Sequence, residues 1–147
     1  GHSGLAGGQY FDLQYEKKKI NKKNIIDMQI KKTGELFGFC CESIGIIKKQ
    51  NKIKKNLLKK LGLNVGLLFQ ITDDLLEVTS DKQTLGKNIN FDKKNNKATY
   101  VNVVGFDEAI VESKKLSDSA IYEISKENIS IIDMLIELAK YITYREK

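Results

Sequence analysis

The stretch LLFQITDDLLEV, residues 67–78, places one amide and three acids among apolar side chains. Its polar residues stand at positions i, i+3, i+4 and i+7: they are Gln70, Asp73, Asp74 and Glu77. On a helix this spacing puts the side chains on one face, with neighbouring Cβ atoms about 5–6 Å apart. We call the three acids, Asp73, Asp74 and Glu77, the acid stripe.

The other side chains of this stretch are apolar around most of the helix, which is typical of a buried helix. Two carboxylates about 6 Å apart repel by less than about 1 kcal/mol in water, but by about 3 kcal/mol at an effective dielectric constant near 20. A buried acid stripe therefore requires a compensating cation, whereas a solvated acidic edge of an ordinary helix does not. The spacing alone leaves both interpretations open, since acid pairs on helices are common.

Magnesium would satisfy the buried interpretation, because Mg²⁺ prefers oxygen ligands and commonly bridges carboxylates to substrate phosphates. The chain also carries donors that could bind phosphate. Lys32 and Thr33 stand in the middle of a predicted helix, and Lys87 and Lys97 stand in a polar segment after the acid stripe. Ammonium groups facing a metal–carboxylate cluster would neutralise a bound diphosphate. The pattern therefore predicts a diphosphate site.

Helical periodicity predicts the elements that must position these side chains. Apolar residues recur at three-to-four-residue spacing over residues 24–47 and 51–78, and again after Asp107, a plausible N-cap. A last helix is predicted over residues 131–144, and a polar connection over residues 79–97. The segment TYVNVV (99–104) has a strand-like composition, but a lone strand lacks a partner, so we expect the start of a helix there. The prediction is a single all-α domain over residues 1–147.

Composition sets limits on the function. The chain has 147 residues, 41% of them hydrophobic and 30% charged, as in ordinary soluble domains. Its net charge of +6 is too small to indicate nucleic-acid binding by itself. Adjacent Cys40 and Cys41 are expected to pack in the core with Phe37 and Phe39 rather than form a disulfide, and no zinc-ligand spacing is present. Without a bilayer-spanning apolar run or a recognisable leader, we expect a cytoplasmic protein.

Five segments, in order along the chain, resemble the C-terminal half of the trans-polyprenyl diphosphate synthases, the farnesyl and geranylgeranyl diphosphate synthase family. They are similar to the family's Gly-Gly-Gln-x-x-Asp-Leu segment, Lys-Thr-Gly helix, second aspartate-rich motif, Gly-Lys loop with a following Lys-x-Thr-Tyr, and closing Arg-x-Lys end. The segments are GLAGGQYFDL (4–13), KTGELF (32–37), GLLFQITDDLLEV (66–78), TLGKNINFD (84–92) with KATY (97–100), and YITYREK (141–147). Each segment is a weak signal alone, and the shared order makes the resemblance specific.

The resemblance implies part of an isoprenoid-synthase-type helical bundle. It also implies Mg²⁺-dependent head-to-tail condensation of isopentenyl diphosphate with an allylic diphosphate, giving farnesyl or geranylgeranyl diphosphate. By position, the acid stripe would bind Mg²⁺. The allylic diphosphate contacts would be Lys32, Thr33, Gln70, Lys87 and Lys97. Support from a neighbouring helix would come from Gln9 and Asp12, and isopentenyl diphosphate would be approached by Arg145 and Lys147.

Two departures from the family pattern matter. Glu77 stands where the family usually has a third Asp, so we expect an altered metal geometry rather than lost binding. The family's first aspartate-rich motif, its arginines and its isopentenyl-binding basic residues belong to an N-terminal half that nothing in this chain matches. We therefore expect the chain to be the C-terminal portion of a polyprenyl synthetase domain, inactive alone, and either a homodimer or associated with the missing half.

Other classes of protein remain as alternatives. A non-catalytic helical subunit or partner of a prenyl synthase would keep the fold without the chemistry. A basic nucleic-acid-binding helical domain would rest on the charge alone, and we do not expect it. A terpene cyclase shares the all-α fold and Mg²⁺ chemistry, but its downstream Asn/Ser/Glu metal motif is not visible in this sequence.

Overall fold

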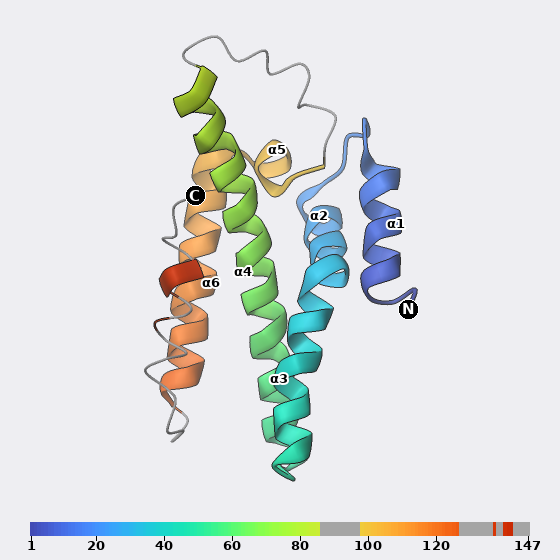
Figure 1. Cartoon of the computed structure of the whole chain (residues 1–147), viewed down its shortest axis with the longest axis vertical. Coiled ribbons are helices and arrows are strands. Elements are labelled where there is room, and N and C mark those ends of the chain that lie inside the picture. The colour runs from blue at the N-terminus through green and yellow to red at the C-terminus, as the bar shows by residue number, and fades with distance from the viewer. Residues whose placement is uncertain (86–97, 127–136, 138–139, 143–147) are drawn as a thin grey trace.

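The computed structural model describes residues 1–85, 98–126, 137 and 140–142. Its elements are α1 (Leu5–Tyr15), α2 (Lys22–Gln29), the π-helical turn η1 (Ile30–Gly34), α3 (Glu35–Ile47), α4 (Lys52–Leu85), α5 (Tyr100–Val104) and α6 (Phe106–Ser125). Every regular element among the described residues is helical, which confirms the predicted all-α class (Figure 1). The long helix α4 lies at the centre: η1 and α3 pack along it, α6 packs against it as well, and α1 packs on η1.

Helices α2 and α3 are joined directly by η1, so residues 22–47 form one helix with a π-helical turn inside it. Asn21 caps its start, since the Asn21 side chain accepts a 2.9 Å hydrogen bond from the Asn24 amide. At η1 the Glu35 amide bonds to the Ile30 carbonyl, five residues back, so this turn holds one more residue than an α-helical turn. The predicted helix over residues 24–47 is confirmed. The π turn was not predicted.

Helix α4 begins after Asn51, whose side chain accepts a 2.9 Å hydrogen bond from the Lys54 amide. The predicted helix over residues 51–78 is confirmed, but α4 continues to Leu85, so the expected start of the polar connection at Thr79 was wrong. No glycine or proline occurs in residues 79–85 to break the helix. The Thr79 hydroxyl donates to the Leu75 carbonyl at 3.1 Å, so this polar side chain finds its hydrogen-bond partner within the helix.

The segment 99–104 does begin a helix. Thr99 caps α5 by accepting a 3.1 Å hydrogen bond from the Asn102 amide, and Gly105, with a φ of 95°, ends it. Helix α6 then starts at Phe106, so Asp107 lies inside the first turn and the predicted N-cap was wrong. A left-handed glycine directly before Phe106 sets the start of α6 in place of an Asp cap. The predicted helix over residues 131–144 lies mostly outside the described residues.

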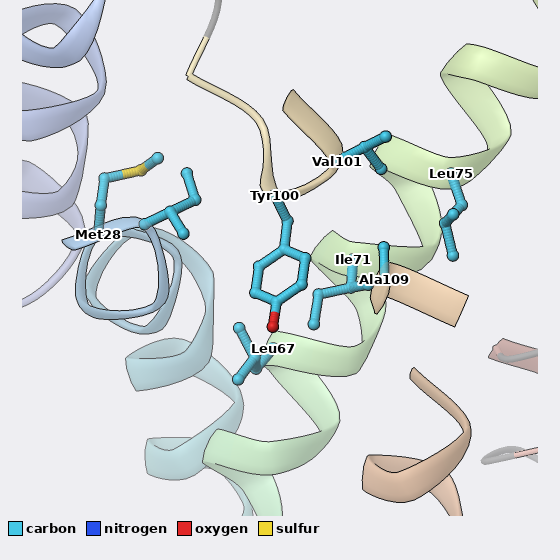
Figure 2. Packing of buried hydrophobic residues seen from close by; sticks show 8 residues of the cluster. Met28, Leu67, Ile71, Leu75, Tyr100, Val101 and Ala109 are labelled. Carbon is cyan, nitrogen blue, oxygen red and sulfur yellow. The ribbon is translucent and has the colours of Figure 1, made fainter. Parts of the chain in front are cut away.

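The core joins α2, α4, α5 and α6. Its largest fully buried side chains are Tyr100, Ile25, Leu68 and Ile71. Figure 2 shows the Tyr100 ring reaching from α5 toward α4, beside Leu67 and Ile71, with Ala109 of α6 near by. The short helix α5 is therefore held by one large buried aromatic side chain, which fixes the chain where it returns to the bundle.

The expectation that Phe39 and Cys40 pack in the core was wrong. The Phe39 side chain is 65% exposed and Cys40 is exposed, whereas Phe37 and Cys41 are half-buried. Helix α3 contacts α4 through Gly38 and Gly45, which share one face because they are seven residues apart. Phe39 and Cys40 lie away from that face. Within the described residues, no helix is both long enough and apolar enough to span a membrane.

Candidate functional site

A hollow of about 470 Å³ opens between α1, η1, α4 and the residues just before α5. It brings together seven of the residues predicted from the sequence: Asp12, Lys32, Thr33, Gln70, Asp73, Asp74 and Glu77. These residues are all half-buried, so their charges lie in a partly desolvated environment. The acid stripe therefore lines a hollow rather than a freely solvated helix edge.

Lysine and threonine occupy one wall of the hollow. Lys32 and Thr33 both belong to η1, and the Lys32 ammonium donates a 2.5 Å hydrogen bond to the Asp12 carboxylate on α1. The side chains of Lys32 and Asp12 are 29% and 17% exposed, so the ion pair is only partly screened by water. The neighbouring Lys31 instead pairs with Asp27 at 2.8 Å. Asp12 thus holds the Lys32 ammonium at the hollow.

Two glycines bring the flanking helices close to η1. A Cβ built on Gly8 of α1 would lie 2.2 Å from the Lys32 amide nitrogen, and one built on Gly66 of α4 would lie 2.7 Å from the Gly34 Cα. Backbone thus meets backbone at both contacts, which only glycine permits. Because Gly66 precedes Gln70 by one helical turn, this packing sets the distance between η1 and the acid stripe.

Acids and one amide form the opposite wall. Gln70 and the acid stripe project from α4, whose apolar residues Leu67, Ile71 and Leu75 are buried in the core. Asp74 Oδ2 accepts hydrogen bonds from Gln29 Nε2 at 2.9 Å and from the Tyr100 amide at 2.7 Å. The acid stripe is therefore tied to α2 and α5 through Asp74.

The side chains around the hollow fit a hard divalent cation. All the anionic groups that line the hollow are carboxylates, whose oxygens are the ligands that Mg²⁺ prefers, and Lys32 and Thr33 line the same hollow. No group of three Asp, Glu, His or Cys side chains in the described part of the chain is arranged as a complete metal cage.

Of the remaining predicted site residues, one is described and lies away from the hollow. Gln9 is exposed on α1 and does not line it. Lys87, Lys97, Arg145 and Lys147 lie outside the described residues, so their roles stay predictions.

The structure adds lining residues that the sequence did not indicate: Met28, Gln29, Ala98 and Thr99. Gln29 could have been found, because it precedes Lys32 by three residues in one predicted helix and so faces the same side. Ala98 and Thr99 depend on the return of the chain to the bundle, which no local pattern reports.

The fold is that of the all-α isoprenoid synthases. A solved structure of an FPP/GFPP synthase from Zymomonas mobilis matches with a TM-score of 0.79 at 34% identity, covering 97% of this chain and 46% of that one. Geranylgeranyl pyrophosphate synthetase from Pyrococcus horikoshii matches with a TM-score of 0.80 at 27% identity, covering 97% of this chain and 55% of that one.

The chain belongs to the polyprenyl synthetase family, whose family model matches residues 2–139. A farnesyl diphosphate synthase from Micrococcus luteus is 36% identical over all of this chain and 50% of its own length. A dimethylallyltranstransferase from Fischerella ambigua is 38% identical over 99% of this chain and 42% of its own length. The chain thus spans about half the length of these relatives, and the family resemblance predicted from its motifs is confirmed.

Proposed function

We propose that this chain forms the diphosphate- and metal-binding part of a prenyltransferase. The reaction is the Mg²⁺-dependent head-to-tail condensation of isopentenyl diphosphate with an allylic diphosphate, giving farnesyl or geranylgeranyl diphosphate. One observation carries the proposal: a single hollow has Lys32 and Thr33 on one wall and the acid stripe on the other. The names of the relatives, farnesyl and geranylgeranyl diphosphate synthases among them, support the same reaction class.

Each wall of the hollow has a distinct role in this proposal. The Lys32 ammonium, oriented by Asp12, donates to a phosphate oxygen, and the Thr33 hydroxyl and Gln70 amide donate to others. Carboxylate oxygens of the acid stripe would hold Mg²⁺. When bound, Mg²⁺ neutralises phosphate charge and so stabilises the diphosphate as a leaving group.

The residues of this chain act mainly on the leaving group. In the proposed reaction the bond between the allylic carbon and the diphosphate oxygen breaks, and the diphosphate keeps the electron pair. The isopentenyl double bond then supplies the electrons of the new carbon–carbon bond, and loss of a proton restores a double bond. Donors at fixed positions around the departing diphosphate lower the barrier, because they stabilise the charge that develops on it.

The remaining parts of the proposal concern segments and partners beyond this hollow. Lys87 and Lys97 would add diphosphate contacts, and Arg145 and Lys147 would approach isopentenyl diphosphate. Gln9 would support the site from α1. We propose that the half of the family fold beyond these residues supplies the opposing carboxylates. We propose a cytoplasmic homodimer, or association with that other half.

Calorimetric titration of the full chain with a thiolo analogue of dimethylallyl diphosphate tests this function. We expect binding that requires Mg²⁺. Lys32→Ala removes a charge-assisted hydrogen bond, worth about 1.5–3 kcal/mol, and should weaken binding roughly ten- to a hundredfold. Lys115→Ala removes an exposed lysine of α6 and is the matched control. Equal binding without Mg²⁺, or equal losses in the two variants, would contradict the proposal. A non-catalytic subunit that lost the chemistry would show no Mg²⁺-dependent binding.

A further inference from the structure

One acid of the stripe, Asp74, contacts two helices besides its own helix α4. A single oxygen of Asp74, Oδ2, accepts hydrogen bonds from two separate elements: Gln29 Nε2 of α2 at 2.9 Å and the Tyr100 amide of α5 at 2.7 Å. Both partners are almost fully enclosed, since Gln29 is 2% exposed and Tyr100 is 0% exposed. The carboxylate of Asp74 therefore connects three helices beneath the hollow.

The bond to Tyr100 fixes the start of α5. The first amides of a helix lack partners within that helix, and Tyr100 is the first residue of α5. Thr99 satisfies the Asn102 amide, and Asp74 satisfies the Tyr100 amide. Ala98 and Thr99, which come directly before, line the hollow. Asp74 thus determines where this part of the wall stands.

The bond to Gln29 allows one orientation of that amide. Gln29 Nε2 must face Asp74, because the reversed amide would set its oxygen against a carboxylate oxygen. In this orientation Gln29 Oε1 is buried with no hydrogen-bond partner among the described residues. Leaving a buried oxygen unpaired is unfavourable, so the orientation indicates that the bond to the charged carboxylate dominates. The side-chain amide of Gln29 is therefore held in the orientation that donates to Asp74.

We propose that Asp74 is a positioning residue, which anchors α5 and orients Gln29, and that Asp73 and Glu77 carry the ligation of the divalent cation. The ligation part rests on the proposed function, and the anchoring part does not. The proposal divides the acid stripe by role: Asp74 builds the wall of the hollow, and its two neighbours on the helix face hold the ion.

Asparagine and alanine variants separate positioning from ligation. Asp74→Asn keeps an oxygen that can accept from Gln29 and Tyr100 but removes the charge, whereas Asp74→Ala removes both. We expect hydrogen exchange at the Tyr100 amide to speed up at least tenfold in Asp74→Ala and to stay within threefold of the parent in Asp74→Asn. Circular dichroism of each variant checks that the helices remain, and Asp118→Asn, at an exposed acid of α6, is the control.

Cation binding is measured with Mn²⁺ and inorganic pyrophosphate by electron paramagnetic resonance. We expect Asp73→Asn to weaken Mn²⁺ binding at least tenfold and Asp74→Asn to weaken it less than threefold. Equal losses in these two variants, together with unchanged Tyr100 exchange in Asp74→Ala, would overturn the proposal. If the parent chain binds no Mn²⁺ with pyrophosphate, the proposed function and the ligation part fail. The exchange measurements then decide the anchoring part separately.

Discussion

Replacing Gly8 by alanine should disturb the cation wall of the hollow from a distance. The added Cβ would lie 2.2 Å from the Lys32 amide nitrogen and 2.4 Å from its Cα, both backbone atoms. Ordinary contacts between such atoms are about 3.5 Å, so α1 must move away from η1 by about 1.3 Å. Asp12 stands one turn further along the same face of α1 and would move with it.

This displacement sets the expected size of the effect. The Asp12–Lys32 bond, now 2.5 Å, would either lengthen beyond hydrogen-bond range or draw the ammonium out of the hollow. Overpacking costs about 1–3 kcal/mol, and alanine returns about 1 kcal/mol of helix propensity. With the weakened ion pair included, we expect a loss of about 1–3 kcal/mol in the free energy of unfolding. Binding of the allylic analogue should weaken roughly tenfold or more.

Urea unfolding and calorimetric titration measure the two effects on one set of variants. Gly45→Ala is the matched control, because its Cβ would meet side-chain atoms of Leu58 and Lys55 at 3.0 and 3.1 Å, far from the hollow. Those flexible side chains can shift, so we expect a smaller loss of stability and unchanged binding. If Gly8→Ala binds the analogue as tightly as the parent, the close approach of α1 does not position Lys32 and the reasoning fails.

Two further predictions concern groups with shifted pKa values. Hydrogen bonds from Lys22 to Glu108 and Glu112, at 3.0 and 3.2 Å, raise the pKa of the Lys22 ammonium. Its contribution is therefore complete below the unfolded-state pKa of about 10.4 and is lost only as the pH rises through the higher folded-state value. Lys22→Gln should cost up to about 1 kcal/mol, equally at pH 7 and 9 in urea unfolding, and a loss that disappears by pH 9 would refute the assignment. Burial, with Cys40 beside it, raises the pKa of the Cys41 thiol, so iodoacetamide at pH 8 should label exposed Cys40 first, and mass spectrometry showing the reverse order would contradict this.

Local patterns in the sequence were sufficient for the helices that carry the site. The i, i+3, i+4, i+7 spacing of Gln70 and the acid stripe was enough to place them on one face of α4, because a helix converts spacing directly into direction. Lys32 and Thr33 lie within the predicted helix over residues 24–47, but in its π turn η1, which the spacing did not predict. The Lys-Thr-Gly and aspartate-rich segments gave the family because they occur in the family's order.

Contacts between distant segments could not be predicted in this way. The pairing of Asp74 with the Tyr100 amide joins residues 26 positions apart, and no periodicity within α4 reports it. Exposure of Phe39 likewise depends on which face of α3 meets α4, and that face is set by Gly38 and Gly45 rather than by the largest apolar residues. The sequence showed which residues share a helix face, and packing between helices decided which faces meet.

Because of the π turn η1, the side chains before it and those after it, in the helix from Lys22 to Ile47, point in directions that one uninterrupted α-helix would not give. Each residue of an α-helix advances the direction of its side chain by about 100°, so one added residue rotates everything after it by that amount relative to everything before it. Before η1, Met28 packs in the core and Gln29 donates to Asp74. After η1, Gly38 and Gly45 face α4. Deleting a single residue from Ile30–Gly34 would bring both halves into one phase, and either the contacts of α2 or those of α3 would then have to turn away from their present neighbours.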